Sequence, residues 1–242
     1  FLMELLRFAT AGSVDDGKST LLGRLLHEAG AVYDDHLRSL RGSPERQVDY
    51  SWVTDGLKAE REQGITIDVA YRYLRLGDRI IIFADAPGHE QYTRNMATAA
   101  SKAEIALLLV DVTKGPLPQT HRHAYIAWLF GVRQFIVAVN KMDLVGFEEP
   151  AFRRTEKVMG EYMSRLGSCS LVCVPTAAPE GHNLHRRSTL TPWFHGESVR
   201  GVLEGMACGG DGEGSLRFAV QGALRGTNGG RRIAGRVLRG TA

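Results

Sequence analysis

The sequence predicts an α/β domain, in which a mostly parallel sheet carries helices on both faces, followed by an incomplete β-barrel segment. Strand-like and helix-like patterns alternate through the first three-quarters of the 242 residues, as a doubly wound sheet requires. Residues 105–111 are nearly continuous Leu and Val, which is typical of a strand buried on both faces. Residues 216–224 and 233–238 alternate weakly, and we expect them to be two opening strands of a barrel that the chain does not close.

The first strand and helix flank a glycine-rich loop. An apolar run over residues 5–9 precedes this loop, and leucines at helical spacing over residues 21–26 follow it. Residues 12–19 match the phosphate-loop pattern G-x-x-x-x-G-K-[ST] between a strand and a helix. Such a loop directs backbone N–H groups and a helix N-terminus toward phosphates. We therefore expect a P-loop NTPase whose nucleotide lies on Gly12, Ser13, Val14, Asp15, Asp16, Gly17, Lys18, Ser19 and Thr20.

Individual side chains of this loop have predicted roles. Lys18 would reach the β- and γ-phosphates, and the Ser19 hydroxyl would ligate Mg²⁺. Asp15 has two open alternatives, since it either helps to hold a monovalent cation near the phosphates or is a solvated loop acid.

The segment after the first helix is predicted to respond to the nucleotide. Residues 29–65 are polar and turn-rich, and a connection of that length inside a compact domain is usually functional. Thr66 offers a hydroxyl that would complete the Mg²⁺ shell. The next two strands, residues 69–74 and 80–84, meet at a hairpin turn over Gly77 and Asp78.

The second strand of that hairpin ends in a further predicted phosphate-sensing loop. Asp85 is placed to hold Mg²⁺ through water, and the Gly88 N–H is placed to bond the γ-phosphate. The loop consists of Asp85, Ala86, Pro87, Gly88 and His89.

The base is predicted to be guanine. The apolar run over residues 135–139 ends in Asn140, Lys141, Met142 and Asp143, at the strand end where open α/β sheets bind ligands. A carboxylate there accepts from N1–H and from the exocyclic amine of guanine, whereas adenine would leave a buried Asp143 unpaired. Such mismatches discriminate by a factor on the order of 10⁴. The alternative is an ordinary turn with an N-x-x-D cap. With the phosphate loop, the pattern favours GTP on Asn140 and Asp143.

The remaining elements complete two expected domains, residues 1–208 and 209–242. Helices are expected over residues 90–101, 119–130 and 152–166, and the last strand of the nucleotide domain over residues 170–174. A helix is expected near residues 198–206, and residues 209–214 are expected to be a flexible stretch.

Composition and charge limit the partners. The 43% apolar and 24% charged content is ordinary for a soluble globular protein, and no apolar stretch approaches the ~20 residues that cross a bilayer. No signal peptide is recognisable, so we expect a cytoplasmic protein without a membrane partner. The net charge of +3 does not argue for nucleic acid. The tail leaves nucleic-acid contact open beside outward-facing arginines, namely Arg217, Arg225, Arg231, Arg232, Arg236 and Arg239.

Cysteines and histidines do not indicate a metal centre. Cys169, Cys173 and Cys208 form no C-x-x-C pair and are expected to be buried or idle thiols. His121 and His123 are two residues apart on a predicted helix and do not share a face. We expect both to be solvated rather than zinc ligands.

Several runs of residues resemble one known family. The loop acids Asp15 and Asp16 and residues 59–68, 70–73 and 89–98 are similar to the signature set of the translation-factor family of GTPases, and within it to the GTPase (large) subunits of bacterial sulfate adenylyltransferase. The similarity extends over about residues 6–175. It implies a G domain that hydrolyses GTP as a regulatory subunit. Adenylylsulfate would be made from ATP and sulfate on a separate small subunit of a heteromeric complex.

The resemblance also implies roles for residues that the patterns alone do not assign. His89 would orient the attacking water, with Lys18 and Thr66 beside it as the catalytic set, while Val14 and Ile65 would shield His89 until activation. Ala86 departs from the usual Thr of this loop. The backbone N–H that contacts the guanine oxygen would come from Thr176, Ala177 and Ala178.

Two other functions are weighed against this one. An elongation factor-like GTPase that carries aminoacyl-tRNA would need complete second and third domains. A truncated, binding-only pseudo-GTPase would bind nucleotide without turnover.

Overall fold

The computed structural model describes residues 4–31, 50, 53, 68–206, 215, 217–225 and 230–239. The chain divides into two compact units, Phe1–Met206 and Ala207–Ala242. Four of the predicted features lie outside the described residues: most of the segment over residues 29–65, Thr66, the stretch over residues 209–214, and Cys208.

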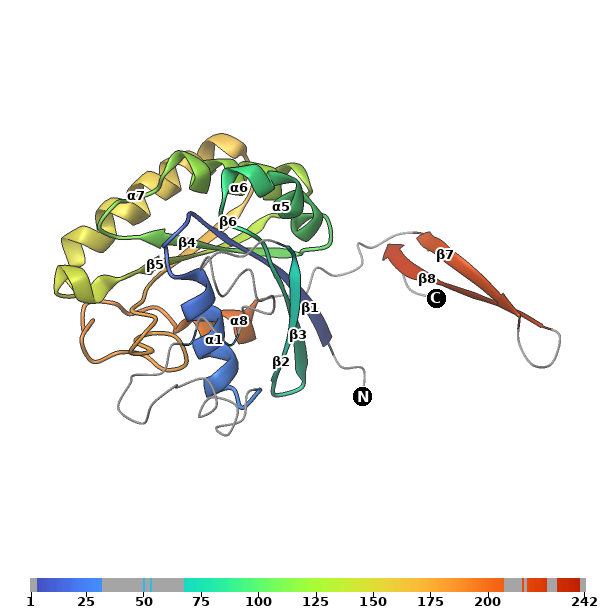
Figure 1. Ribbon diagram of the computed structural model, residues 1–242, viewed down its shortest axis with the longest axis horizontal. Coiled ribbons are helices and arrows are strands. Elements are labelled where there is room, and N and C mark those ends of the chain that lie inside the picture. The colour runs from blue at the N-terminus through green and yellow to red at the C-terminus, as the bar shows by residue number, and fades with distance from the viewer. Residues whose placement is uncertain are drawn as a thin grey trace. The chain divides into compact units, whose positions relative to one another are not determined.

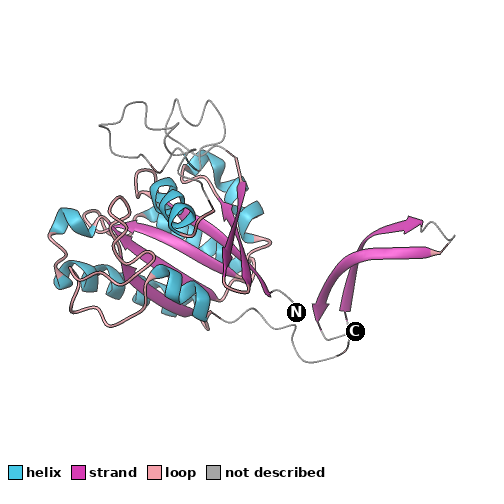
Figure 2. Cartoon of the chain, turned by 90° about the horizontal axis from the view of Figure 1, so that it is seen from below, coloured by secondary structure: helices cyan, strands magenta, loops and turns pink. Residues whose placement is uncertain are grey.

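The first unit is built on a six-stranded sheet in the order β2-β3-β1-β4-β5-β6 (Figure 1). The edge strand β2 is antiparallel to β3, and the other neighbours run parallel. Figure 2 shows the strands of this sheet lying side by side with helices around them. Their bounds are β1 (Glu4–Gly12), β2 (Ala70–Leu76), β3 (Arg79–Asp85), β4 (Ile105–Asp111), β5 (Gln134–Asn140) and β6 (Ser170–Pro175).

Helices cover both faces of the sheet, as predicted. In Figure 1, α5, α6 and α7 lie on one side of the sheet, and α1 and α8 lie on the other. The predicted helix over residues 90–101 divides into a 3-10 turn, η1, and α5. The bounds are α1 (Lys18–Glu28), η1 (Glu90–Tyr92), α5 (Thr93–Ala100), α6 (Pro118–Leu129), η2 (Met142–Val145), α7 (Glu149–Leu166) and α8 (Val199–Gly205).

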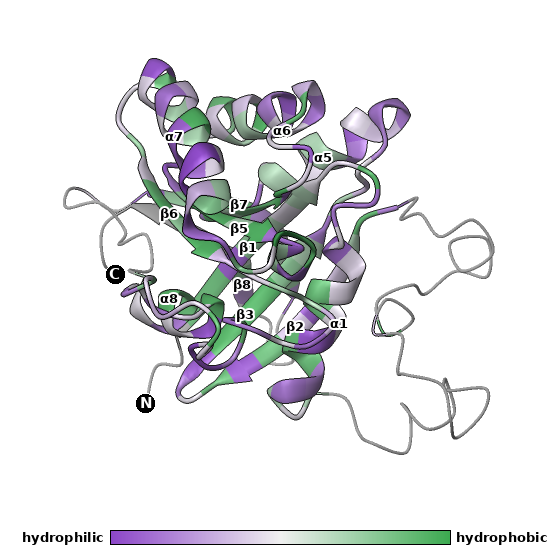
Figure 3. Cartoon of the chain, turned by 90° about the vertical axis from the view of Figure 1, so that its left-hand side faces the viewer, coloured by the Kyte–Doolittle hydropathy of each residue, from purple (hydrophilic) through white to green (hydrophobic). Residues whose placement is uncertain are grey.

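The centre of the sheet forms the core. All seven residues of β4 are buried, which confirms that a nearly continuous apolar run marks a strand covered on both faces. Phe8 of β1 packs on Phe83 of β3 with ring centroids 5.6 Å apart. Figure 3 shows the apolar colouring concentrated on the strands of the sheet, with polar residues on the outer sides of the helices. Among the described helices, none combines the length and apolar character needed to cross a bilayer.

The second unit contains an antiparallel hairpin of β7 (Arg217–Arg225) and β8 (Arg231–Arg239), whose register shifts near Val220. Phe218, Val220, Leu224 and Ile233 are exposed. Further strands would cover these apolar side chains in a closed barrel. The separate antiparallel pair confirms the expected partial barrel segment. An isolated two-stranded hairpin is marginally stable in water.

The prediction that both α6 histidines are solvated is wrong for His123. His123 is fully buried, together with Thr120, Ala124 and Ala127 on the same helix. Residues three and four apart share a helix face, and this face of α6 packs on β4 and β1. The polar character of histidine concealed this inward position.

A core substitution tests the role of β4. Leu107 is fully buried and Leu129 of α6 is 57% exposed. Leu107→Ala is expected to lower the free energy of unfolding by about 2–5 kcal/mol because it leaves a cavity between packed layers. The matched control Leu129→Ala is expected to change it by less than about 0.5 kcal/mol. Urea unfolding followed by circular dichroism measures both, and equal losses would contradict the assignment of β4 to the core.

Candidate nucleotide-binding site

The described residues of the predicted site come together at the carboxyl ends of the parallel strands. The loops concerned follow β1, β3, β5 and β6, and β1 is paired with β3 on one side and β4 on the other. Because parallel strands end at the same edge of a sheet, loops from distant parts of the sequence become neighbours there. The hydrogen bonds described below join these loops to one another.

The phosphate loop, residues 12–19, ends at the N-terminus of α1. Gly17 caps the helix with a φ of 89°, in the left-handed region, and a Cβ at this position would lie 2.5 Å from the Asn140 side-chain nitrogen. Only glycine satisfies both constraints. The loop therefore presents the helix N-terminus, with its outward N–H groups, as an anion-binding position. Val14 and Asp15 are exposed on the loop, and Ser19 and Thr20 are half-buried in the first turn.

Lys18 and Asp85 form a buried ion pair. The Lys18 Nζ lies 2.7 Å from Asp85 Oδ1, and the two side chains are 7% and 1% exposed. The Thr10 hydroxyl donates to the same carboxylate oxygen at 3.0 Å. A buried charge is costly unless it is paired and hydrogen-bonded, and the Asp85 carboxylate has both kinds of partner, Lys18 and the Thr10 hydroxyl. The residues that the sequence assigns to phosphate and to Mg²⁺ are thus in direct contact.

The loop after β3 approaches the phosphate loop closely. The Ala86 N–H donates to the Thr10 carbonyl at 3.2 Å, and a Cβ on Gly88 would lie 2.7 Å from the Gly12 carbonyl. Gly88 is therefore required for close approach rather than for a special φ. His89 is half-buried at the start of η1, where its Nδ1 accepts from the Gln91 N–H at 3.4 Å. The structure brings Asp85, Ala86, Pro87, Gly88 and His89 beside the phosphate loop.

Asn140 connects three loops through one buried side chain. Its Nδ2 donates to the Asp16 carbonyl at 2.8 Å. Its Oδ1 accepts from the Ala178 N–H at 3.0 Å and from the Thr176 hydroxyl at 3.3 Å. The Asn140 side chain is 1% exposed, so these bonds are made away from water. Asn140 thus fixes the phosphate loop relative to the base loop, residues 176–178.

The other residues of the loop after β5 differ in exposure. Lys141 has a φ of 64° and its Nζ lies 2.9 Å from Asp111 Oδ2. Burial opposes ionisation of Asp111, yet hydrogen bonds from Lys141 and Thr113 hold its pKa below the ordinary value. Met142 is buried, and its N–H donates to the Thr176 carbonyl at 3.1 Å. Asp143, the next residue of η2, is exposed, whereas the sequence predicted a buried carboxylate.

The three backbone N–H groups of the base loop differ in how strongly they are hydrogen-bonded within the protein. The Thr176 N–H donates to Val139 at 2.8 Å, and the Ala178 N–H is engaged by Asn140. The Ala177 N–H makes only a long contact of 3.4 Å to the His182 carbonyl, beyond the usual 2.7–3.2 Å range. Of the three donors, that of Ala177 is the least committed to the protein. All three residues of the loop are fully buried.

The Asp16 carboxyl turns back onto its own loop. Asp16 is 2% exposed, and its Oδ2 accepts from the Ser13 N–H at 2.7 Å. Burial raises the pKa of Asp16 to about 6, and the nearby Asp111 carboxylate adds to this shift. The hydrogen bond from Ser13 and the positive charges of Lys114 and Lys141 act in the opposite direction. Asp16 therefore fixes the conformation of the loop through its hydrogen bond with Ser13, and its ionisation lowers the stability of the folded chain.

The first turn of α6 borders the site and was not singled out by the sequence. Ser13 Oγ lies 3.4 Å from Thr120 Oγ1. Burial lowers the pKa of His123 to about 4, and the positive charges of Lys18 and Arg122 contribute. His123 is thus neutral, with Nε2 2.9 Å from Gln119 Nε2. Thr10, Asp111 and Thr120 are also site neighbours. The sequence could have indicated Asp111 as a site residue, because it lies at the carboxyl end of the predicted strand over residues 105–111.

The donor set fits a magnesium–nucleotide complex. Within the described ranges, no group of three or more His, Cys, Asp and Glu side chains gathers as a metal cage. Mg²⁺ usually takes one or two protein ligands and completes its shell with water and phosphate oxygens. The Ser19 hydroxyl and the Asp85 carboxylate, beside the helix N-terminus, suit that coordination.

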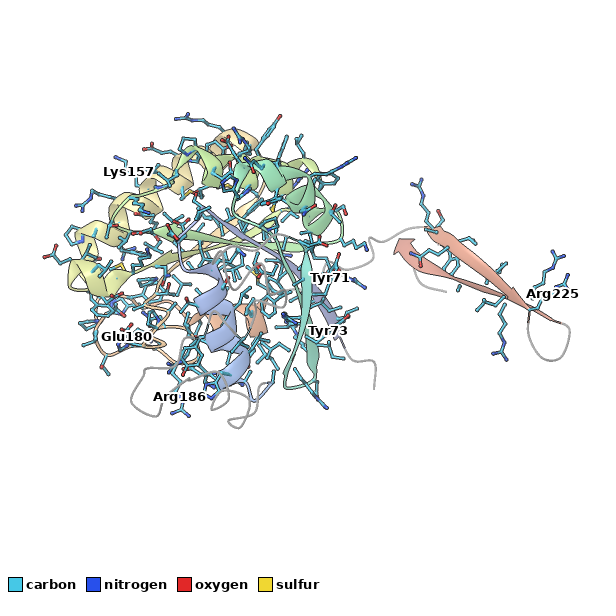
Figure 4. The ribbon with its side chains drawn as sticks, viewed as in Figure 1. Tyr71, Tyr73, Lys157, Glu180, Arg186 and Arg225 are labelled. Atoms are coloured by element: carbon cyan, nitrogen blue, oxygen red, sulfur yellow. The ribbon has the colours of Figure 1, made fainter. Side chains whose placement is uncertain are left out.

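A separate hollow lies on the sheet away from these loops. It has a volume of about 260 Å³ and shares no lining residue with the predicted site. Tyr71 and Tyr73, labelled on β2 in Figure 4, line it together with Arg7 of β1. Lys102, after α5, places its Nζ 5.8 Å from the Tyr71 ring centroid. The hollow is therefore not part of the nucleotide site.

Fold and loop arrangement together define a P-loop GTP-binding domain. The family model described as "Elongation factor Tu GTP binding domain" matches residues 3–217, which is most of the chain. This chain belongs to that family, and the expected translation-factor G domain is confirmed.

Two curated relatives are similar to this chain over most of its length. The chain is 53% identical over 211 residues to "Sulfate adenylyltransferase subunit 1" of Tolumonas auensis, which covers 85% of this chain and 45% of the relative. It is 51% identical over 245 residues to "Bifunctional enzyme NodQ" of Azospirillum brasilense, which covers 98% of this chain and 40% of the relative. The chain thus spans less than half the length of these relatives.

A solved structure supports the fold. The crystal structure of bacterial selenocysteine-specific elongation factor EF-Sec is similar with a TM-score of 0.63 and 25% sequence identity, over 98% of this chain and 35% of that one.

Replacing Asp16 tests its buried position. The folded-state pKa of about 6 exceeds the ordinary value of 3.8, so the contribution of Asp16 to stability is present below about pH 4 and is lost as the pH rises to about 6. Asp16→Asn removes that loss. Above pH 6 we expect the free energy of unfolding of the variant to exceed that of the unsubstituted chain by up to about 3 kcal/mol.

This difference in the free energy of unfolding between Asp16→Asn and the unsubstituted chain should shrink as the pH falls from about 6 to about 4. Urea unfolding at several pH values without nucleotide measures this difference. A difference that is independent of pH would contradict the raised pKa.

Proposed function

We propose that this chain is the GTP-hydrolysing regulatory subunit of a sulfate adenylyltransferase, and that it couples GTP hydrolysis to adenylylsulfate synthesis from ATP and sulfate on a separate small subunit. The observation that carries the proposal is the 53% identity to a sulfate adenylyltransferase subunit 1, in a chain whose phosphate and guanine loops meet at one edge of the sheet.

The phosphate loop and its neighbours provide the chemistry for phosphoryl transfer. We assign the triphosphate to residues 12–20 at the start of α1, with Lys18 on the β- and γ-phosphates. Ser19, Asp85 and Thr66 are the proposed Mg²⁺ ligands, Asp85 through water. The ion would neutralise charge on the phosphate oxygens. The buried contact of Lys18 with Asp85, 2.7 Å long, supports placing both groups at the same phosphate end of the site.

His89 is the proposed water-positioning residue. Gly88 lies against the Gly12 carbonyl of the phosphate loop, which supports placing His89 beside the proposed γ-phosphate position. His89 would orient water for in-line attack, and the chain needs no covalent intermediate because phosphoryl transfer depends on positioning and charge neutralisation. Lys18 and Thr66 complete the proposed catalytic set.

The guanine base is assigned to the loops after β5 and β6. Asp143 would accept from N1–H and from the exocyclic amine, and its exposure leaves the carboxylate accessible to the base. The Ala177 N–H is the proposed donor to the guanine oxygen, because its 3.4 Å contact is the weakest among the three loop donors. Asn140 would act by holding both loops together. Lys141, Met142, Thr176 and Ala178 complete the proposed base site.

The partner and the location follow from the same proposal. Relatives named subunit 1 imply a second subunit in a heteromeric complex, where we place the adenylyl transfer because this sequence has no second nucleotide motif. We propose a cytoplasmic complex without a membrane or nucleic-acid partner. We also propose a nucleotide domain over residues 1–208 and a barrel segment over residues 209–242.

GTP turnover tests the proposed function against its rivals. Hydrolysis that rises when the small subunit, ATP and sulfate are added is the expected result. Stimulation by ribosomes would favour an elongation factor instead, and nucleotide binding without turnover under either condition would favour a binding-only chain.

A His89 variant tests the proposed catalytic role. His89→Ala is expected to leave GTP affinity nearly intact and to lower hydrolysis at least roughly tenfold, because the water loses its orienting group. Equilibrium binding of a fluorescent GTP analogue and phosphate release measure the two effects. Equal losses in both would refute the role assigned to His89.

A second variant tests the base contact. Asp143→Asn exchanges a carboxylate acceptor for an amide that also donates, so the variant is expected to shift its preference from guanine toward xanthine nucleotides. Competition between GTP and XTP for the same site measures the preference. A variant that still favours GTP as strongly as the parent chain would count against Asp143 as the base-reading group.

A further inference from the structure

Arg24 on α1 links the two halves of the proposed nucleotide site. We propose that Arg24 is a positioning residue that holds the base loop in register with the phosphate-loop helix and thereby sets how strongly the site reads the guanine 6-oxygen. The inference rests on the proposed GTP site and adds to it a residue that lies in none of the four loops.

The contacts of Arg24 reach a segment far away in the sequence. Its Nη1 donates to the Pro179 carbonyl at 2.9 Å, across 155 positions of sequence. Its Nε donates to Glu28 Oε1 at 2.6 Å, one helical turn further along α1. The Arg24 and Glu28 side chains are 21% and 19% exposed. Pro179 directly follows the base loop, so this bond ends one residue beyond Ala178.

The segment after Pro179 packs on the same pair. Gly181 has a φ of +83°, and a Cβ there would lie 2.7 Å from Glu28 Oε1 and 3.0 Å from Arg24 Nη2. The Gly181 N–H donates to the Ala177 carbonyl at 3.0 Å. The turn that begins at Ala177 therefore closes directly over the guanidinium group. Glu180, exposed within this turn, is labelled in Figure 4.

The base loop is thus held from two sides. On one side Asn140 engages the Ala178 N–H at 3.0 Å, and on the other Arg24 engages the Pro179 carbonyl. Ala177, the proposed donor to the base, lies before both of these anchors. Helix α1 begins at Lys18 of the phosphate loop. Arg24, on the same helix, therefore fixes the position of the base loop relative to the phosphate loop.

Arg24 also anchors a residue of the long connection after α1. Its Nη1 lies 3.2 Å from the Tyr50 hydroxyl, and the guanidinium carbon lies 4.8 Å from the Tyr50 ring centroid. A Cβ on Gly23 would lie 1.9 Å from the Tyr50 carbonyl, so the backbone at Tyr50 rests directly on α1. Three contacts thus meet at one planar group, whose fork of donors suits several acceptors at once.

An ordinary i,i+4 pair would not have these consequences. Arg–Glu pairs on a helix surface contribute little to stability. Arg153 on α7 forms such pairs within its own helix, with Glu149 at 3.0 Å and with Glu156 at 2.7 Å, and its side chain is 49% exposed. Arg24 differs because its remaining donors engage Pro179 and Tyr50. Arg153 therefore provides the matched control.

Nucleotide analogues test the proposal. The probes are GTP, the triphosphate of 2-aminopurine riboside, and ITP. The 2-aminopurine nucleotide lacks the 6-oxygen and with it the N1–H, whereas ITP keeps both and lacks the 2-amino group. In Arg24→Met the preference for GTP over the 2-aminopurine nucleotide should fall about three- to tenfold, the range expected for one displaced hydrogen bond. The preference for GTP over ITP should be unchanged, because the amino group is read by Asp143. Since the same carboxylate reads N1–H, an unchanged preference over ITP assigns the effect of Arg24→Met to the 6-oxygen.

Controls separate positioning from general loss of structure. Arg153→Met should leave both preferences unchanged. Arg24→Lys keeps the charge beside Glu28 but lacks the fork, so its preference should lie between those of the parent chain and Arg24→Met. This variant decides the question if Arg24→Met does not fold.

Equal changes in both preferences, or no change in either, would overturn the role of Arg24. If the parent chain itself does not distinguish GTP from the two analogues, the proposed function fails instead.

Discussion

The buried amide of Asn140 is the interaction on which the rest of the site depends. One side chain satisfies the phosphate loop through the Asp16 carbonyl and the base loop through the Ala178 N–H. Both bonds are made in a buried position, where an unpaired amide would cost free energy. The separation of the two loops is therefore set by two buried hydrogen bonds to one rigid amide group rather than by flexible surface contacts. Gly17 follows from the same constraint, because a Cβ there would collide with the Asn140 nitrogen.

Charge in the site is arranged by burial. Lys18 and Asp85 neutralise each other in a position nearly free of water, with Thr10 supplying an additional bond. Burial keeps His123 neutral beside this cation and raises the pKa of Asp16 to about 6. The start of α1 adds partial positive charge beside this ion pair. An anionic triphosphate with Mg²⁺ matches this arrangement, since it supplies new partners for both Lys18 and Asp85.

Helix α1 connects the phosphate end of the site to its base end. Its N-terminus follows Gly17, and its outer turn carries Arg24 and Glu28 against the segment after the base loop. A rigid helix transmits position over several turns, whereas the loops by themselves would not. Tyr50, in the long connection after α1, contacts the same turn of α1 through Arg24. Loops carry the chemistry of such domains, and regular elements hold the loops in place.

The sequence by itself determined the order and type of the elements, because hydrophobic periodicity reports burial: the seven buried residues of β4 were readable as a continuous apolar run. It also predicted the phosphate and guanine loops, because their residue types and spacing form local patterns. Only the tertiary structure decided the burial of His123, the exposure of Asp143 and the bond from Arg24 to Pro179. These features depend on contacts between segments up to 155 positions apart, and no local pattern encodes which distant carbonyl a side chain will meet.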